Sequence, residues 1–201
     1  MGKYKIIAIE RQYASGGRAI GKKVARALGI PYYGREILEM AAERNGQTAE
    51  YIEHLEETAS NSMFYALLTA YNRAAHGEVE VLSPEDTLLL TETEIINDLA
   101  GEGPCVFIGR SAGCILKDRP DVLRVFIYSD DDARIERAVK EYGDDPKEVM
   151  SKLRKFDKRR ENYYNVNYSL KWEDHAGYHL CLDSGKLGID NCVKILVDLM
   201  K

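Results

Sequence analysis

Short apolar runs alternate along the chain with longer segments of helical periodicity. A run rich in β-branched residues from Lys5 to Ile9 predicts a buried strand, and residues 30–33 predict a second, shorter one. Similar runs at 104–109, 122–128 and 178–184 predict the remaining strands. These runs are continuously apolar rather than alternating, which is typical of strands in a parallel sheet that helices cover on both faces.

Helical periodicity fills the segments between those runs. After the first strand, Gly29 and then Pro31 end a helical pattern formed by Ile20, Val24, Ala27 and Leu28. Further helices are predicted at 35–46, 61–77, 83–103, 130–143, 145–168 and 188–201. The helix at 83–103 is expected to open on Ser83 as its cap and Pro84 as its first residue. The acids at 130–132 are interpreted as a helix start that the helix dipole favours.

This alternation of strands and helices predicts the fold class. We expect an α/β domain of three layers, in which a roughly five-stranded parallel sheet lies between two layers of helices. The chain has 201 residues and shows neither repeats nor a low-complexity linker, so a single domain over residues 1–201 is expected. The helical run at about 35–103 is interpreted as an insertion that covers a substrate.

Composition excludes several classes of protein. With 45% hydrophobic and 30% charged residues, the chain is globular rather than disordered. A net charge of -5 argues against a surface built to bind nucleic acid, although it allows a local basic pocket. The cysteines lack zinc-ligand spacing and are mostly predicted to be core residues. No apolar run approaches the roughly 18 residues of a membrane span, so we expect a cytoplasmic protein without a membrane partner.

A glycine-bearing turn follows the first strand, where parallel α/β sheets bind ligands. The backbone N–H groups of Ser15, Gly16 and Gly17 would approach phosphate oxygens there, and Arg18 would hold a phosphate through its guanidinium. The match to the common phosphate loop, G-x-x-x-x-G-K-[ST], is poor, because Gly17 stands at the lysine and Ala19 at the metal-binding hydroxyl. The turn is also typical of a plain strand-to-helix connection in which glycine tolerates positive φ.

Four separated blocks of the chain together resemble the cytidylate kinase-like family, a branch of the nucleoside monophosphate kinases. They occur in the family's order, and the resemblance is weakest between about 48 and 101; the blocks span 10–38, 103–116, 125–143 and 152–190. The family's turn resembles R-x-Y-G-S-G-G-R-x-I, and this chain departs from it at Ala14, which stands at a glycine. The missing lysine is therefore a trait of this branch rather than damage to this chain.

The resemblance implies a fold of the P-loop kinase type and a nucleotide whose phosphates lie at residues 15–19. It implies ATP and Mg²⁺ as cofactors and small-molecule nucleotides as partners, with no nucleic acid. The region at about 146–172 is similar to the lid of monophosphate kinases. Neither the metal ligands nor the oligomeric state is predicted.

The resemblance also implies an acceptor site. Arg110, at the end of the third strand, and the Asp-x-x-Arg spacing of Asp157 and Arg160 match family residues that contact the acceptor nucleotide. Arg35 would meet the acceptor phosphate. Ser111 stands where true cytidylate kinases have an acid, and Gly34 likewise replaces an acid; both are departures from the family's pattern.

Catalysis in such enzymes needs cations at the developing charge more than covalent chemistry. The resemblance assigns that role to Arg18, Arg154 and Arg160. Arg134 and Arg137 also match the family's pattern, but are interpreted as features of the fold as much as of a site. On the residues alone, Arg110 would equally make a surface ion pair, and the charged helix around Arg160 would equally be a solvated face.

Three functions remain open on the sequence. The first is ATP-dependent phosphoryl transfer to a nucleoside monophosphate or similar phosphorylated acceptor, with CMP the acceptor that the family name indicates. The second is a non-catalytic nucleotide-binding or sensing module, which the missing lysine, Ala19 and Ser111 favour. The third is an interaction protein that uses its helical lobe and keeps a vestigial pocket.

Overall fold

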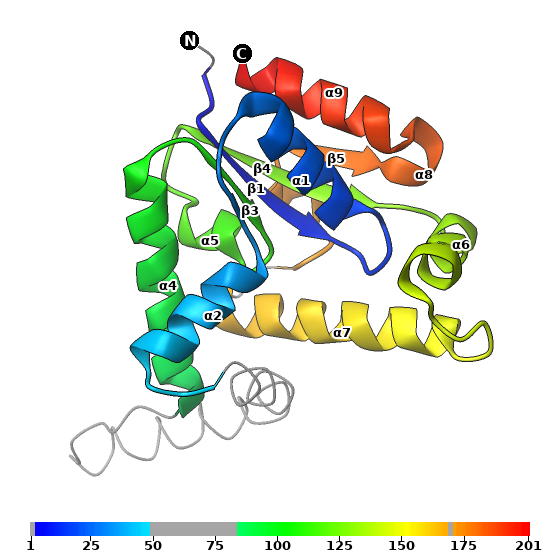
Figure 1. Ribbon diagram of the computed structural model, residues 1–201, viewed down its shortest axis with the longest axis horizontal. Coiled ribbons are helices and arrows are strands. Elements are labelled where there is room, and N and C mark those ends of the chain that lie inside the picture. The colour runs from blue at the N-terminus through cyan, green and yellow to red at the C-terminus, as the bar shows by residue number, and fades with distance from the viewer. Residues whose placement is uncertain (1–2, 49–83, 169–170) are drawn as a thin grey trace. The chain divides into compact units, whose positions relative to one another are not determined.

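The computed structural model describes residues 3–48, 84–168 and 171–201 (Figure 1). The chain divides into two compact units, one formed by Met1–Gly34 with Ile96–Lys201 and the other by Arg35–Ile95. The predicted insertion at 35–103 overlaps the second unit, and its role in covering a substrate stays a prediction. The candidate chemistry described below lies in the first unit, apart from Arg35.

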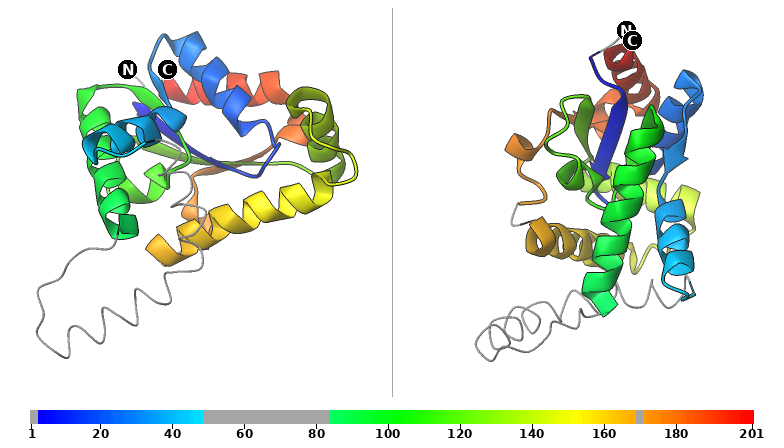
Figure 2. Two further views of the ribbon diagram at one scale, coloured as in Figure 1. Left: turned by 60° about the horizontal axis from the view of Figure 1, so that its bottom comes forward. Right: turned by 90° about the vertical axis from the view of Figure 1, so that its left-hand side faces the viewer.

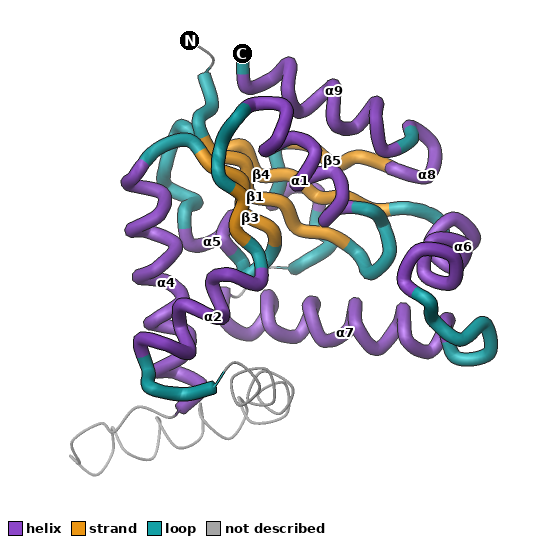
Figure 3. The backbone as a smooth tube through the Cα atoms, in the orientation of Figure 1, coloured by secondary structure: helices purple, strands orange, loops and turns teal. Residues whose placement is uncertain are grey.

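The first unit is built on a five-stranded parallel sheet of order β2-β3-β1-β4-β5 (Figure 3). This confirms the predicted sheet and its roughly five strands. The strands are β1 (Ile6–Arg11), β2 (Tyr32–Tyr33), β3 (Cys105–Ile108), β4 (Val122–Tyr128) and β5 (Leu180–Asp183). Because all of them are parallel, their carboxyl ends meet at one edge, where the β1–α1 loop and the turn after β3 both lie.

One face of the sheet packs against α1 (Gly17–Leu28) and α9 (Ile189–Met200), which lie side by side (Figures 1 and 2). The apolar cluster between them includes Ile9 from β1, Val24 from α1 and Leu196 from α9. The helical pattern predicted for α1 is confirmed except at Ala27, which is exposed, because the buried stripe passes through Ala25 instead.

The opposite face packs against the short helix α5 (Ala112–Ile115) and the second half of α7 (Val149–Tyr168). Strand side chains alternate between the two faces, so Phe126 points away from α1 and joins Cys114, Tyr164 and Trp172 in a buried cluster. Helices on both faces complete the predicted three layers.

Two of the remaining elements, α6 (Asp131–Tyr142) and α8 (Ser184–Leu187), follow β4 and β5 at the carboxyl edge of the sheet. The 3-10 turn η1 (His175–Gly177) comes just before the amino end of β5. Asp130 caps α6 by accepting a hydrogen bond from the N–H of Ala133, which confirms the predicted helix start. The sequence did not predict α5, η1 or α8, because three- and four-residue helices carry no detectable periodicity.

The second unit contains α2 (Arg35–Arg44) and the beginning of α4 (Pro84–Glu102), which starts at the predicted proline. Thr91 of α4 donates a hydrogen bond to Asn45 over 3.3 Å. The helix predicted at 61–77 and the Ser83 cap lie outside the described residues. No helix in the described ranges combines the length and the apolarity that crossing a membrane requires.

Candidate phosphate-binding site

The β1–α1 loop (residues 12–16) makes a tight turn between the strand and the helix. Ser15 closes it, because both its N–H and its hydroxyl donate to the carbonyl of Gln12, at 3.3 and 2.9 Å. The backbone is left-handed at Ala14, with φ 56°, and at Gly16, with φ 81°. A left-handed conformation costs a non-glycine residue about 1–2 kcal/mol, so Ala14 is held there by its surroundings.

The N–H groups at the start of α1 form one side of this loop. Those of residues 16–19 have no hydrogen-bond acceptor among the described residues, and the first turn of α1 carries no acid. Such N–H groups, together with the helix dipole, favour an anion. The Arg18 side chain is exposed beside them and makes no hydrogen bond or ion pair within the described part of the chain.

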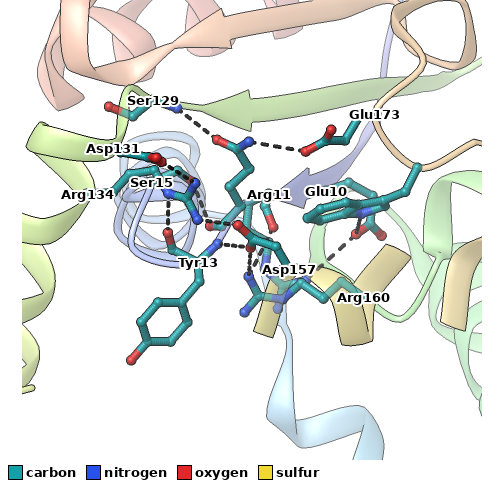
Figure 4. A network of polar contacts seen from close by, with 12 residues as sticks. Glu10, Arg11, Tyr13, Ser15, Ser129, Asp131, Arg134, Asp157, Arg160 and Glu173 are labelled. Carbon is teal, nitrogen blue, oxygen red and sulfur yellow. Dashed lines mark hydrogen bonds and ion pairs between the residues drawn. The ribbon is translucent and has the colours of Figure 1, made fainter. Parts of the chain in front are cut away.

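Arginine side chains hold the carbonyl side of the loop (Figure 4). Arg134 of α6 donates from Nε to the Tyr13 carbonyl over 2.8 Å, and Arg137 donates to the Ala14 carbonyl over 2.6 Å. Nearby, Arg160 of α7 donates to the Arg11 carbonyl over 3.2 Å. With their carbonyls bonded to cations from α6 and α7, these peptide units are fixed in orientation.

Asp157 of α7 connects the loop to two of these arginines. Its carboxylate accepts from the Tyr13 N–H over 2.6 Å, accepts from Arg134, and lies 3.6 Å from Arg160. Burial raises the pKa of Asp157, while the Tyr13 N–H and the Arg134 guanidinium oppose that rise. Burial and the nearby guanidinium of Arg11 lower the pKa of Arg160. The predicted Asp-x-x-Arg pair is therefore bonded to the loop, through Asp157, and to the last residue of β1, through Arg160.

Tyr13 fastens the loop to α7 through its side chain. Its hydroxyl donates to Asp144 over 2.9 Å, and Lys152 also pairs with Asp144. The Tyr13 ring stacks on Phe156, with the ring centroids 4.7 Å apart. This contact adds an apolar anchor to the polar ones that α6 and α7 already provide.

The turn after β3 lies at the same edge of the sheet. Gly109, Arg110 and Ser111 are all left-handed, with φ of 75°, 58° and 51°. A Cβ at Gly109 would lie 2.0 Å from Nη1 of Arg11, so a side chain there would displace that guanidinium. Each non-glycine residue in such a conformation costs on the order of 1–3 kcal/mol, and residues of this kind concentrate at functional sites.

Glu10, the penultimate residue of β1, was missed by the sequence predictions. It is 6% exposed, accepts from the Trp172 indole N–H over 3.4 Å, and lies 3.8 Å from Arg11. Burial raises the pKa of Glu10, and Arg11, Trp172, Arg160 and Ser111 oppose that rise. The one signal in the sequence was an acid directly after a buried apolar run, which is also how an ordinary strand ends.

A cavity of about 420 Å³ lies between α6, α7 and the segment before β5. It contains the predicted Arg154, which is exposed, together with Asp157. Its lining is formed by Gln12, Asp131, Arg134, Met150, Leu153, Arg154, Asp157, Lys158, Glu161, Trp172 and Glu173. Its lining combines charged and apolar side chains, which would suit a small polar molecule.

The structure thus brings together most of the predicted site. Residues 15–19, Asp157 and Arg160 share the carboxyl edge of the sheet with the turn that carries Arg110. Arg35 belongs to the second unit, where it pairs with Glu39 over 3.5 Å. Among the described residues, no group of three or more His, Cys, Asp or Glu side chains could hold a metal ion. The assigned roles of all these residues stay predictions.

Comparisons with known proteins agree with this arrangement. A model of the cytidylate kinase-like family matches residues 6–186. An uncharacterized protein from Eubacterium ventriosum is 24% identical, with a TM-score of 0.70 and coverage of 97% of both chains. No curated protein matches the chain.

Two kinases of small molecules have a similar fold. Shikimate kinase from Acinetobacter baumannii is 15% identical, with a TM-score of 0.53 over 99% of this chain and 94% of that one. A gluconokinase from Sinorhizobium meliloti is 15% identical, with a TM-score of 0.51 over 100% and 95%. These similarities show the P-loop kinase fold, and the family match covers most of the chain. The chain belongs to the cytidylate kinase-like family.

Proposed function

We propose that this protein transfers a phosphoryl group from ATP to a small phosphorylated acceptor, a nucleoside monophosphate with CMP as the first to test. One observation carries the proposal: the N–H groups of residues 16–19 stand without an acceptor among the described residues, beside an Arg18 that has no partner there. Family membership and the P-loop kinase fold support the same reaction class.

The residues present fit the phosphates of a nucleotide. The N–H groups of residues 16–19 lie at the positive end of the α1 dipole, which favours an anion. Arg18 adds a full positive charge, and its guanidinium can donate two parallel hydrogen bonds to a phosphate. Magnesium bound with ATP needs only one or two protein ligands, since phosphates and water supply the rest. Mg-ATP would supply the phosphoryl group and neutralise part of its charge.

The chain's own contribution is positioning. Arg134 and Arg137 hold the loop carbonyls, so that the N–H groups do not need to reorganise when charge develops on a transferring phosphoryl group. Arg110 and Arg160 would orient an anionic acceptor at the neighbouring turn. A phosphate acceptor is already a nucleophile, so the proposal requires no side-chain base.

A non-catalytic nucleotide sensor is the second candidate, and one observation favours it. Asp157 and Arg160, the residues that would contact the acceptor, already bond to Tyr13 and Arg11. Binding an acceptor through them would require those bonds to be exchanged. If they are not exchanged, the loop would hold a nucleotide without transferring its phosphate.

Turnover measured beside binding separates the two candidates. The purified protein is incubated with Mg-ATP and a panel of nucleoside monophosphates, and ADP is quantified. Shikimate and gluconate, which would accept the phosphoryl group on a hydroxyl, serve as comparisons. Calorimetry on the same sample measures ATP binding. ADP formation that depends on a monophosphate supports the kinase. ATP binding without ADP for any acceptor supports the sensor and contradicts phosphoryl transfer.

A further inference from the structure

Arg11, the last residue of β1, is a partly buried arginine to which the proposed reaction assigns no role. Its side chain is 23% exposed, and its guanidinium lies 3.8 Å from the Glu10 carboxylate, which is too far for a hydrogen bond. Glu10 has a donor of its own in the Trp172 indole N–H. A guanidinium carries five N–H donors, and those of Arg11 make no hydrogen bond to the described residues. This donor capacity is left for a ligand.

The stem of the Arg11 side chain fills the space beside Gly17, the first residue of α1. A Cβ added at Gly17 would lie 2.6 Å from Cβ and 3.0 Å from Cγ of Arg11, closer than such atoms come in proteins. The Cβ of Arg11 is fixed by the strand backbone, so it cannot move aside as the tip of a side chain can. Position 17 therefore has no room for a side chain while residue 11 carries one.

Residues 11 and 17 also have a defined relation in the common phosphate loop. In G-x-x-x-x-G-K-[ST], the lysine follows the first glycine by six residues. With Gly17 at the lysine, Arg11 therefore stands at the first glycine, so that glycine and cation have exchanged places. The contact between the two residues gives this exchange a steric reason, since only one of the two positions can carry a side chain.

The Arg11 guanidinium reaches the turn after β3, at the carboxyl edge of the sheet. The atoms nearest to a Cβ at Gly109 would all belong to this guanidinium, which therefore lies against that glycine. Arg160 is close by, because it donates to the Arg11 carbonyl (Figure 4). Burial, and after it the charge of Arg11, lowers the pKa of Arg160 to about 9. Neighbouring guanidinium groups repel one another, so an anion beside them would be stabilised.

We propose that Arg11 supplies the cation of the missing phosphate-loop lysine and binds the β- and γ-phosphates of ATP. The lysine of the common loop reaches those phosphates from the start of the helix, whereas Arg11 approaches them from the end of the strand, past Gly17. Arg18 is a second, exposed cation at the same loop. The inference rests on the proposed function in so far as ATP is the phosphate donor.

Isothermal titration calorimetry of the full chain with Mg-ATP tests this assignment through the Kd. Arg11→Gln removes the charge and keeps most of the stem. The Kd should rise at least about tenfold, which is the factor for losing one hydrogen bond to a charged group. Arg26→Gln is the matched control, since it removes one positive charge from the last turn of α1. Its Kd should stay within about twofold of the wild type.

Restoring the order of the common loop gives a sharper comparison. Arg11→Gly should weaken ATP binding as much as Arg11→Gln does. Adding Gly17→Lys to Arg11→Gly should return the Kd to within about threefold of the wild type. The lysine has room in this double variant, because the next neighbour of its Cβ is the Cβ of Ile127 at 3.4 Å. An arginine that served only Glu10 would not be replaced by a lysine on another element.

ADP formation, measured on the same variants, separates this inference from the proposed function. If Arg11 binds phosphate during transfer, kcat/KM for ATP should fall roughly 100-fold in Arg11→Gln. ATP binding that depends on Arg11, without ADP formation from any monophosphate, rejects the kinase and supports Arg11 as a phosphate-binding residue. Wild-type ADP formation by Arg11→Gln supports the kinase and rejects the assignment of Arg11.

Three binding results overturn the inference. The first is a Kd for ATP in Arg11→Gln within about twofold of the wild type. The second is a loss of affinity confined to CMP, which would assign Arg11 to the acceptor. The third is a wild type that binds no ATP. A folded double variant that binds ATP no better than Arg11→Gly contradicts the exchange of places.

Glu10→Gln decides if the double variant does not fold. This change removes the ion pair of Arg11 and leaves Arg11 itself in place. The Kd for ATP should therefore stay within about threefold of the wild type. A loss of affinity equal to that of Arg11→Gln would mean that Arg11 only neutralises Glu10, and would overturn the inference.

Discussion

The two sides of the β1–α1 loop use arginine for opposite purposes. On the carbonyl side, Arg134 and Arg137 donate to the backbone oxygens of Tyr13 and Ala14. On the N–H side, Arg18 is exposed and makes no bond to the described residues. The difference teaches that a guanidinium near a phosphate loop is not evidence of a ligand contact. Arg134 and Arg137 already donate to backbone carbonyls, whereas Arg18 makes no such bond among the described residues.

Arg134→Ala removes one of the arginines that donate to the loop carbonyls. We expect this change to have the largest effect, which is on the free energy of unfolding. Arg134 is 6% exposed at its side chain and pairs with Asp157, so the change leaves a largely buried carboxylate without this ion pair. The free energy of unfolding should fall by about 3 kcal/mol, at the lower end for a broken buried pair because Asp157 is still 16% exposed. Urea denaturation measures it. Arg154→Ala, an exposed arginine, is the control and should change stability by less than about 0.5 kcal/mol.

Arg18→Ala removes the cation on the N–H side of the loop. We expect it to lower the rate of the reaction and to leave the free energy of unfolding unchanged. If Arg18 replaces the missing lysine, its loss should remove about 2–4 kcal/mol of transition-state stabilisation. The value of kcat/KM for ATP should therefore fall roughly 30- to 1000-fold. Stability should be unchanged within about 0.5 kcal/mol. Arg26→Ala, in the last turn of the same helix, is the matched control. An unchanged rate for Arg18→Ala would mean that the backbone N–H groups alone hold the phosphate.

This comparison also separates what the sequence could predict from what it could not. The strands and long helices were predictable, because the apolar runs and helical stripes are local. The spacing of Asp157 and Arg160 was also visible. Their partners, Tyr13 and Arg11, lie more than 140 residues earlier in the chain, so no local pattern could pair them.

Glu10 shows a second limit of sequence reasoning. Its chemistry depends on the side of the sheet to which it points and on what covers that side. Strand alternation places Glu10 on one face, but only the fold brings Trp172 to it. The left-handed backbone at Arg110 was invisible for a similar reason, because nothing in Gly-Arg-Ser distinguishes a strained turn from a relaxed one.

Two substitutions inside the loop sharpen the comparison at smaller scale. Gly16→Ala should cost about 2 kcal/mol of stability, because alanine is unfavourable at φ 81° and its Cβ would lie 2.4 Å from Cδ1 of Ile189. Ala14→Gly should stay within about 1 kcal/mol, since relief at φ 56° is offset by glycine's entropy and a lost buried methyl group. Thermal denaturation of both variants measures the contrast. A larger loss for Ala14→Gly would mean that the Ala14 methyl contributes more than its backbone strain costs.

The smallest expected effect is the change in the free energy of unfolding with pH that comes from Glu10. Its folded-state pKa is raised above 4.5 by burial, so the folded chain binds this proton more tightly than the unfolded chain. The contribution of Glu10 to stability is therefore greatest below pH 4.5 and declines as pH rises through the folded-state pKa. Urea denaturation of the wild type and of Glu10→Gln should be measured across pH. As pH rises, the free energy of unfolding of the wild type should fall relative to that of the variant. A difference independent of pH would contradict burial of an ionised Glu10.

The most direct measurement concerns the N–H groups themselves. Amide ¹⁵N–¹H NMR spectra of the full chain, recorded while Mg-ATP is added, report each backbone N–H separately. The phosphate-loop account predicts that the largest shifts fall on residues 16–19 and that Arg18→Ala weakens the apparent affinity. Saturating nucleotide that leaves these amides unmoved, or that shifts another region instead, would contradict it.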